Sequence, residues 1–186
     1  SRSGVMGSQT QVRMRGAEAN HVLVLIDGVE ANDPSLADET SWASLSAANI
    51  ERIEVIRGPQ SALYGSDAMA GVISLTTHSN KEPFAADFFS EVGNYSTTRS
   101  GVNAGFVQEK INIGFSGSHV ETSGDNISRS GNEKDGYRNK TWNFRAGLTL
   151  SDQLSASIMA RGNHGVNFFD ADDDYDGLVE DRDYFT

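Results

Sequence analysis

The sequence predicts a small α+β domain in its first half, followed by an antiparallel β-meander in its second half. Short apolar runs separated by Gly- and Pro-containing turns indicate the α+β domain. Period-two alternation of apolar and polar residues, with turns that are alternately short and long, indicates the meander. This alternation is typical both of a transmembrane β-barrel and of one sheet of a soluble β-sandwich, so periodicity alone leaves these two architectures open.

The first predicted strand is the continuous apolar run at residues 22–26, which Asp27 and Gly28 end as a turn. A run that is apolar on both faces predicts a strand that is covered on both sides. After it, residues 43–48 are expected to form a short helix, with Ser41 or Ser44 as its N-cap.

Residues 50–77 predict two further strands around a turn region. The residues that mark these strands are Ile53, Val55 and Ile56, then Val72, Ile73 and Leu75. Between them Gly58, Gly65 and Gly71 interrupt the regular structure, and residues 61–64 are expected to form one helical turn after Pro59.

The meander is predicted to contain five strands and the beginning of a sixth near Tyr184. The five strands are expected at residues 85–93, 98–107, 111–121, 137–150 and 154–166. The predicted connections are short at residues 94–97, 108–110 and 151–153, and long and polar at residues 123–136 and 167–183. Short turns at one end and long loops at the other are typical of bacterial transmembrane barrels.

Composition excludes several classes of function. The net charge of −11 argues against nucleic-acid binding, which requires a basic surface. The chain has no Cys, and its four His residues lack the spacing of metal ligands. No phosphate-binding loop with Lys-Ser/Thr and no H-E-x-x-H motif is present, so we do not expect an enzyme. The mean hydropathy of −0.43 suits a soluble protein but equally suits the alternating strands of a barrel.

Several motifs resemble the plug domain of TonB-dependent outer-membrane receptors. They are Arg15-Gly16, IDG at residues 26–28, RIEVIRGPQSALYG at residues 52–65, Ala68, and Gly71-Val72-Ile73. The resemblance implies an α+β plug domain at residues 1–80, truncated at its N-terminus. At residues 81–186 it implies the first five to six strands of a transmembrane β-barrel with external loops. Both ends of the sequence look cut, so we expect a fragment whose barrel is not closed. The resemblance favours the barrel over the β-sandwich.

The same resemblance implies a function at the bacterial outer membrane. Receptors of this family take up scarce nutrients, so the expected ligand is cobalamin, a ferric siderophore or haem. The expected partners are outer-membrane lipid and the protein TonB, which would act through an N-terminal segment that this sequence lacks. Two other interpretations remain: a receptor of the same fold that signals, and a soluble calcium-binding β-protein with a structural or adhesive role.

Two segments resemble the cobalamin (vitamin B12) transporter subfamily in particular. They are HVLVLIDGV at residues 21–29 and YGSDA at residues 64–68. By this resemblance, Asn32, Ser66 and Asp67 are expected to face the ligand. The alternative interpretation is that they are only polar tips of loops.

Charged residues alternate with apolar ones along the strand expected after residue 50. The barrel that the resemblance implies would bury this face, so Arg52, Glu54 and Arg57 are expected to face the barrel wall and to form charge pairs between plug and barrel. The alternative is ordinary solvent-facing charges on a half-buried strand.

An acidic run near the end of the sequence fits the D-x-D-x-D-G start of a calcium-binding loop at residues 172–177. Resemblance to the cobalamin transporters implies a calcium site that is shared between two external loops. The predicted ligands are Glu133 and Asp135 from one loop, with Asp172, Asp174, Asp176 and Glu180 from the other. The alternative is a solvated acidic loop that binds no ion.

Overall fold

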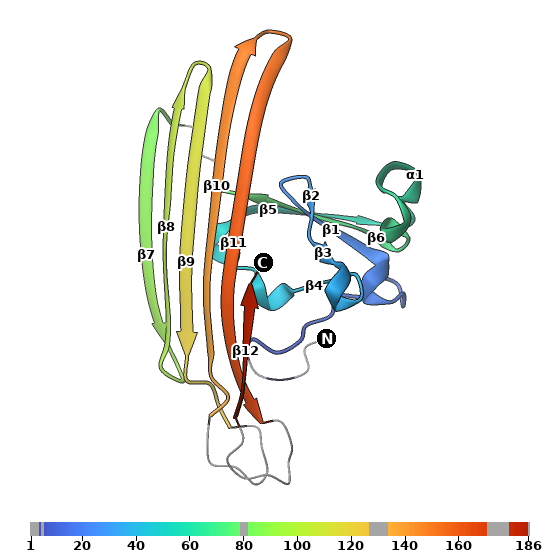
Figure 1. Ribbon diagram of the computed structural model, residues 1–186, viewed down its shortest axis with the longest axis vertical. Helices are drawn as coiled ribbons and strands as arrows, with labels where there is room; N and C mark the ends of the chain where they lie inside the picture. The colour runs from blue at the N-terminus through green and yellow to red at the C-terminus, as the bar shows by residue number, and fades with distance from the viewer. Residues whose placement is uncertain (1–3, 5, 79–81, 127–133, 171–178, 186) are drawn as a thin grey trace. The chain divides into compact units, whose positions relative to one another are not determined.

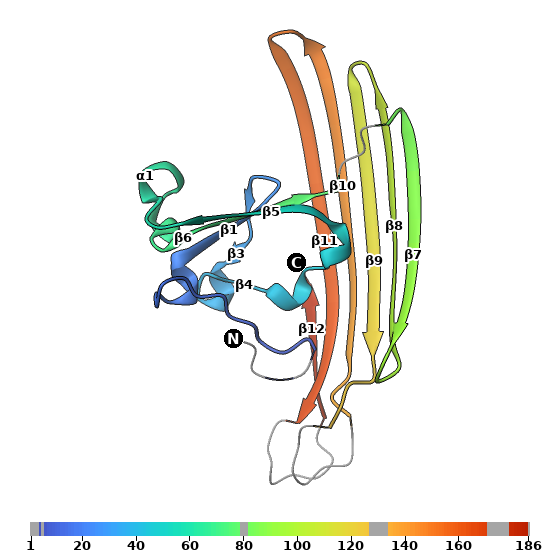
Figure 2. The same ribbon diagram turned by 180° about the vertical axis from the view of Figure 1, so that it is seen from behind.

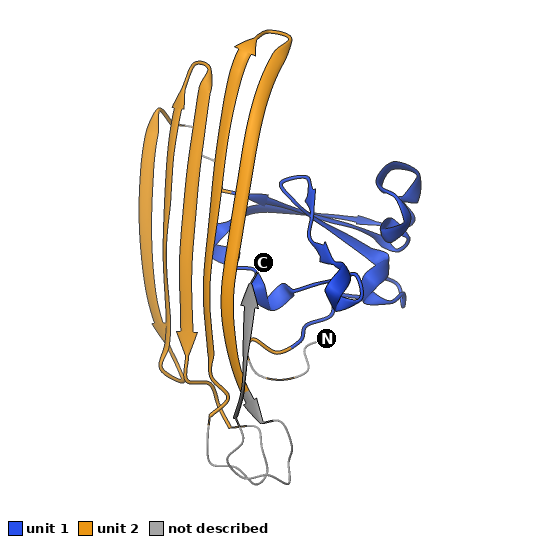
Figure 3. Cartoon of the chain, viewed as in Figure 1, with its two compact units in different colours: residues 1–3, 9–77 blue, residues 4–8, 78–186 orange. Residues whose placement is uncertain are grey.

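The computed structural model describes residues 4, 6–78, 82–126, 134–170 and 179–185. Contacts between Cα atoms divide the chain into two compact units (Figure 3). The first unit is built on Gln9–Thr77, and the second is built on His78–Thr186 together with Gly4–Ser8.

The first unit contains a four-stranded mixed sheet (Figure 1). Its order is β2-β1-β6-β5, in which β1 and β6 run parallel and the other neighbours run antiparallel. These strands are β1 (Val22–Ile26), β2 (Val29–Glu30), β5 (Ile50–Arg57) and β6 (Gly71–Thr77). A separate antiparallel pair is formed by β3 (Asn32–Asp33) and β4 (Glu39–Thr40). The strands predicted in this half are therefore confirmed.

Strand β1 is covered on both faces, as its continuous apolar run predicts. Val22 and Val24 belong to one buried cluster with Leu75, whereas Leu23 packs with Val72 in another. Each of these five side chains is at most 3% exposed. Burial of these side chains supplies the main stabilisation of the central strands.

The turn between β1 and β2 is formed by Asp27 and Gly28, whose φ angles of 52° and 85° are left-handed. An Asp-Gly pair favours this conformation in a two-residue hairpin turn. The Asp27 carboxylate also accepts two hydrogen bonds from Thr77, one from its N–H at 2.9 Å and one from its hydroxyl at 2.6 Å. Asp27 thereby ties the end of β1 to the end of β6, although the two residues are 50 positions apart.

The helical segments of the first unit are short. Helix α1 (Ser61–Tyr64) is the helical turn predicted after Pro59. Three 3₁₀ turns are η1 (Ala19–His21), η2 (Pro34–Leu36) and η5 (Ser66–Ala68). Within the described residues, no helix has the length and apolar character needed to cross a membrane.

The helix predicted at residues 43–48 is wrong. The chain instead forms two further 3₁₀ turns, η3 (Trp42–Ser44) and η4 (Ala47–Asn49). Neither turn has a side-chain cap, and the Ser44 hydroxyl donates to the Ser41 carbonyl at 2.7 Å. Such local hydrogen bonds from serine offer the backbone an alternative to the α-helix.

The second unit is a six-stranded antiparallel meander with the order β12-β11-β10-β9-β8-β7 (Figure 2). Its strands are β7 (Phe84–Gly93), β8 (Thr97–Gln108), β9 (Ile111–Thr122), β10 (Tyr137–Ser151), β11 (Leu154–Asp170) and β12 (Val179–Phe185). The predicted meander is confirmed, but β11 ends later and β12 begins earlier than expected. Asn167, which the sequence places in a loop, is paired with Tyr137 on one side and Arg182 on the other.

Connections of different length meet opposite ends of this sheet (Figure 1). The strand ends joined by residues 94–96, 123–136 and 171–178 lie at one end, which we call the long-loop end. The turns at residues 109–110 and 152–153 lie at the other. The predicted alternation of short and long connections is confirmed, with one short turn at the long-loop end.

The two faces of the meander have opposite character. On β10, the apolar residues Trp142, Phe144 and Leu148 are 45%, 37% and 42% exposed, whereas Asn139 and Thr141 are only 3% and 6% exposed. A barrel wall in lipid has this inverted pattern, with apolar side chains outward and polar ones inward. A soluble β-sandwich would bury the apolar face instead. The structure therefore supports the barrel wall and gives no support to the soluble alternative.

Hydrogen bonds between side chains of neighbouring strands organise the polar face. They join Asn103 to Asp87 at 2.8 Å, Asn143 to Ser116 at 3.0 Å and Thr141 to Asn163 at 3.2 Å. Buried polar groups need such partners, because leaving them unpaired is costly. We call this side of the sheet the polar face and the opposite side the apolar face.

Candidate functional site

The turn between β7 and β8 lies at the long-loop end of the meander and has a strained backbone. The Thr97 N–H donates to the Asn94 carbonyl at 3.0 Å and closes the turn. The two central residues, Tyr95 and Ser96, have left-handed φ angles of 57° and 54°. Left-handed backbone costs roughly 1–2 kcal/mol for each residue other than Gly. Strain of this kind is concentrated at binding and catalytic sites, so this turn is a candidate functional element.

Contacts with the start of the next long connection hold the turn in place. The hydroxyls of Thr97 and Thr122 lie 2.8 Å apart in a hydrogen bond. The Tyr95 carbonyl accepts from the Ser123 N–H at 3.0 Å and from the Thr122 hydroxyl at 3.3 Å. Because Thr122 ends β9, these bonds join two neighbouring connections into one structure.

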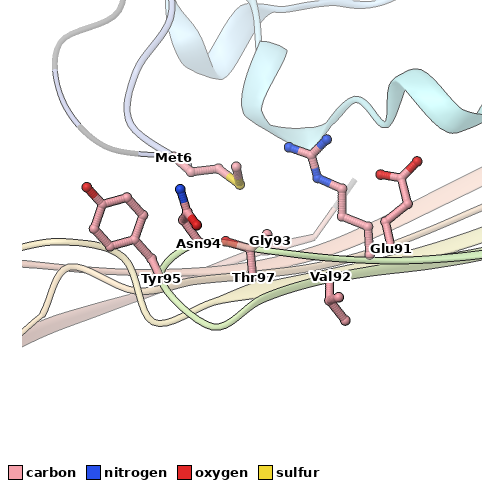
Figure 4. A pocket seen from close by; sticks show the side chains of 8 residues that line it. Met6, Glu91, Val92, Gly93, Asn94, Tyr95 and Thr97 are labelled. Atoms are coloured by element: carbon pink, nitrogen blue, oxygen red, sulfur yellow. The ribbon is translucent and has the colours of Figure 1, made fainter.

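A pocket of about 310 Å³ opens beside this turn (Figure 4). The pocket is lined by side chains of several chemical types, from Met6, Glu91, Asn94, Tyr95, Thr97 and Arg99. Val92 also borders the pocket, but its side chain points away from those of Glu91 and Met6 (Figure 4). The volume lies at the lower end of the range of small-molecule sites, roughly 300–1,000 Å³.

The pocket combines charged, amide and aromatic groups. Glu91 and Arg99 are opposite each other in the β7–β8 ladder, and both are exposed. No ion pair joins them in the part of the chain that the structure describes. The guanidinium can donate several hydrogen bonds and the carboxylate can accept them, while the Tyr95 ring offers an apolar surface. The arrangement suits a polar ligand that also carries a flat or apolar part.

Asn32, predicted to face the ligand, makes several hydrogen bonds within the first unit. Its Oδ1 accepts from the Val24 N–H at 2.8 Å. Its Nδ2 donates to the carbonyls of Val22 at 3.1 Å and Asp38 at 2.7 Å. The amide therefore fixes the loop after β2 against β1, and a direct ligand contact remains a prediction.

Ser66 and Asp67, the other two predicted ligand contacts, lie in η5 beside α1. The Ser66 hydroxyl donates to Asp67 Oδ1 at 3.0 Å, and Ser66 is exposed. Neighbouring Leu63 and Tyr64 are 80% and 42% exposed. This tip presents both polar and apolar groups, and its role in binding remains a prediction.

The three charged residues predicted to contact the barrel lie on β5, at the edge of the first sheet. Arg52 and Glu54 form an ion pair with each other at 3.4 Å, and both side chains are more than half exposed. Arg57 is exposed at the end of the same strand. An exposed pair of this kind contributes little to stability. The contacts of these three residues with the barrel wall remain a prediction.

Most of the predicted calcium ligands lie outside the described residues. This applies to Glu133, Asp172, Asp174 and Asp176, and Glu180 is described only as a backbone position in β12. Asp135 is 3% exposed, and its N–H donates to the Asp125 carbonyl at 3.2 Å. In the part of the chain that the structure describes, no group of three His, Cys, Asp or Glu side chains is arranged to hold a metal. The calcium site remains a prediction.

Sequence reasoning missed the pocket beside the β7–β8 turn. It identified residues 94–97 only as a short turn. One signal was available: on a period-two strand, Glu91 and Arg99 fall on the same face as the polar Asp87 and Asn103. The contribution of Met6 could not be found in this way, because it comes from a segment distant in sequence.

Comparison with known proteins gives the family. Residues 1–72 match the TonB-dependent receptor plug domain. Over 179 residues the chain is 33% identical to the vitamin B12 transporter BtuB of Vibrio vulnificus (strain CMCP6). This alignment covers 92% of the chain but only 28% of that transporter.

Solved structures share the fold. The siderophore receptor PirA from Acinetobacter baumannii superposes with a TM-score of 0.69 at 23% identity, over 88% of this chain and 26% of that one. A mutant of the ferric enterobactin receptor PfeA from Pseudomonas aeruginosa, in complex with enterobactin, superposes with a TM-score of 0.66 at 20% identity, over 87% of this chain and 27% of that one. The small mixed sheet, the meander with its outward apolar face and these relationships agree: the chain belongs to the TonB-dependent receptors of the outer membrane.

Proposed function

We propose that the complete receptor containing this chain takes up a scarce nutrient across the outer membrane, with energy delivered through TonB. The observation that carries the proposal is the inverted meander, because a wall with a polar inner face encloses a water-accessible lumen. The family relationship supports the plug domain as the element that controls this lumen. No catalytic step is part of the proposal.

Cobalamin is the first candidate for the substrate. The related protein from Vibrio vulnificus is named as a vitamin B12 transporter, and the segments at residues 21–29 and 64–68 support the same choice. Ferric siderophores are the second candidate, because PirA is named as a siderophore receptor and PfeA as a ferric enterobactin receptor.

We assign the first contacts with substrate to two surfaces. One is the pocket beside the strained β7–β8 turn, where Tyr95 and Arg99 offer an aromatic ring and a guanidinium. The other is the exposed tip with Ser66 and Asp67. In this scheme Asn32 acts as a positioning residue, because its amide holds the loop after β2.

The test is uptake by the complete receptor in a bacterial strain that lacks its own cobalamin and catecholate receptors. Labelled cobalamin and a labelled ferric catecholate are supplied separately, in TonB-positive and TonB-deficient cells. We expect energised uptake of cobalamin that disappears without TonB. Uptake of the ferric chelate alone would transfer the assignment to siderophores, and TonB-independent entry of both would overturn the proposal.

Replacement of Tyr95 by Ala in the same assay tests the pocket. We expect the substrate concentration for half-maximal uptake to rise about tenfold, because a buried aromatic contact contributes on the order of 1–2 kcal/mol. Val92→Ala is the matched control, since Val92 is 86% exposed and points away from the pocket. Equal effects of the two substitutions would remove the pocket from the binding scheme.

A further inference from the structure

The hydroxyl of Thr122, the last residue of β9, uses its full hydrogen-bonding capacity. It accepts from the Thr97 hydroxyl at 2.8 Å and from the Gly124 N–H at 3.1 Å. It donates to the Tyr95 carbonyl at 3.3 Å. A hydroxyl has one donor and two acceptor sites, so these three bonds leave none for water. Thr122 is also only 6% exposed, which shields the bonds from solvent.

The Tyr95 carbonyl that receives one of these bonds belongs to the central peptide unit of the β7–β8 turn. The same oxygen accepts from the Ser123 N–H at 3.0 Å, so both of its lone pairs are used. The direction of this carbonyl depends on the torsion angles on either side of the peptide bond, ψ of Tyr95 and φ of Ser96. The φ of Ser96 is left-handed at 54°, which is unfavourable for residues other than Gly. The two bonds to one oxygen therefore oppose a flip of this peptide unit into a less strained turn.

The position of Thr122 is itself fixed by the base of the connection that follows β9. Gly124 has a left-handed φ of 66°, and a Cβ added there would overlap the Asp135 carbonyl. The Asp135 N–H donates to the Asp125 carbonyl at 3.2 Å. The first and last residues of the connection therefore meet, and this closed base holds the Gly124 N–H against the Thr122 hydroxyl.

We propose that Thr122 is a positioning residue of the pocket beside the β7–β8 turn. Thr122 is not among the residues that line this pocket, so it acts through Tyr95 and Thr97, which are (Figure 4). By fixing the central peptide unit, its hydroxyl keeps the strained turn in the conformation that binds substrate. The apparent affinity of a protein falls in proportion to the fraction that is in its binding conformation. This inference rests on the proposed function of the pocket in uptake.

The experiment uses the complete receptor and measures uptake of labelled cobalamin over a range of concentrations. If only the ferric catecholate is taken up, that chelate replaces cobalamin as the probe. Thr122→Val keeps the size of the side chain and removes the hydroxyl. We expect the concentration for half-maximal uptake to rise about fivefold, with an unchanged maximal rate, because less of the receptor is in its binding conformation.

Two further variants separate the hydroxyl from the general packing of the side chain. Thr122→Ser keeps the hydroxyl and should retain the wild-type concentration for half-maximal uptake. Ser96→Gly, added to Thr122→Val, should recover part of the lost affinity, because Gly adopts a left-handed backbone at little cost. A purely structural defect at Thr122 would not be corrected by a change in the turn.

Thr98→Val is the matched control. Thr98 is exposed and lies on the opposite side of β8 from Thr97, because side chains alternate along a strand. This variant should leave both uptake parameters unchanged. Equal effects of Thr122→Val and Thr98→Val would overturn the proposal. Loss of Thr122→Val from the outer membrane, or a lower maximal rate with unchanged half-saturation, would assign Thr122 a structural role alone and would also overturn it.

Amide hydrogen exchange of the purified receptor tests the positioning role without substrate. The N–H groups of Thr97 and Ser123, which donate to carbonyls of the turn, should exchange about tenfold faster in Thr122→Val and at the wild-type rate in Thr98→Val. Unchanged exchange in Thr122→Val would overturn the proposal even if uptake is confirmed. If neither probe is taken up, faster exchange still supports Thr122 as the residue that positions the turn, and the proposed uptake function alone fails.

Discussion

At the scale of single residues, the stability of the first unit depends on positions that restrict both the backbone conformation and the size or hydrogen bonding of the side chain. Asp27 combines a left-handed φ with two hydrogen bonds to Thr77. Gly71 approaches its neighbours so closely that an added Cβ would lie 2.4 Å from the Ile56 carbonyl oxygen and 2.7 Å from Met14 Sδ. Both positions hold β6 in place, because Gly71 begins that strand and Thr77 ends it.

Asp27→Ala is expected to lower the free energy of unfolding by about 2 kcal/mol, because it removes two charge-assisted hydrogen bonds to Thr77. Asp27→Asn should lose less, since an amide can still accept from the Thr77 N–H and tolerates the left-handed backbone. The measurement is thermal unfolding of the chain in detergent, followed by circular dichroism. Equal stability of the Ala variant and the wild type would contradict this role of Asp27.

Gly71→Ala is expected to destabilise the protein by about 2–4 kcal/mol, because a backbone carbonyl cannot move aside as a flexible side chain can. Gly114→Ala serves as the control, since an added Cβ there meets nothing within 4 Å. The same unfolding measurement compares the two. A Gly71→Ala variant as stable as Gly114→Ala would show that β5 and β6 separate more easily than their contacts suggest.

At the scale of elements, the face of the sheet on which a residue lies decides which substitutions are tolerated at that position. On β10, Phe144 faces outward with 37% exposure, whereas neighbouring Asn143 bonds to Ser116 on the polar face. Phe144 belongs to the apolar face, between Trp142 and Leu148. Introducing a charged side chain should therefore affect stability very differently at these two adjacent positions.

Phe144→Arg in the complete receptor should destabilise the inserted barrel by about 1–3 kcal/mol, because the cost of arginine on the lipid face falls from the midplane toward the interfaces. Asn143→Arg should cost far less, because its side chain faces the polar side. The readout is the urea concentration at the midpoint of unfolding from lipid vesicles. Equal midpoints for the two variants would contradict the assignment of the faces.

The β7–β8 turn is an element whose sequence does not suit its conformation. Asn-Gly is the pair that favours a two-residue turn with two left-handed residues, whereas the chain has Tyr95 and Ser96. The double change Tyr95→Asn and Ser96→Gly should raise the stability of the hairpin by about 1 kcal/mol and weaken substrate uptake. Ser96→Gly alone should gain part of the stability and retain uptake. If the double variant takes up substrate normally, the strain serves no purpose in binding.

At the scale of the whole molecule, the described sheet has two edges. Strands β7 and β12 stand at the ends of the strand order, and no further strand pairs with either among the described residues. Unpaired strand edges promote aggregation in water and are not tolerated in the hydrocarbon core of a membrane. The apolar face adds to this tendency, because it is exposed across several strands.

The chain alone is therefore expected to associate in detergent-free buffer and to remain dispersed only in detergent. Analytical ultracentrifugation at several protein concentrations measures this directly. A monodisperse monomer with a cooperative thermal transition in plain buffer would contradict the open-sheet description. The first unit can add to this association, because its edge strand β5 exposes Ile53, Val55 and Ile56 at 59%, 49% and 39%.

Much of the fold follows from local patterns in the sequence. The alternation along residues 141–150, the Asp-Gly turn and the apolar run at residues 22–26 each specify an element through contacts between near neighbours. The long connection predicted at residues 123–136 follows in the same way from polar, turn-forming composition, whereas the one predicted at residues 167–183 is shorter, because β11 continues to Asp170 and β12 begins at Val179. The short helix at residues 43–48 failed because serine hydrogen bonds compete with helix formation at so short a length.

Most of the candidate site was decided by contacts between residues far apart in the sequence. Met6 and Arg99 line one pocket, and the role of Asn32 depends on the carbonyls of β1 that lie beside it. The amino-acid sequence by itself determined which elements form and which face of each strand is apolar, because those properties depend on spacing along one chain segment. Only the tertiary structure decided which polar groups already have partners and which line a pocket. Hydrogen bonds, burial and backbone strain arise where distant segments meet.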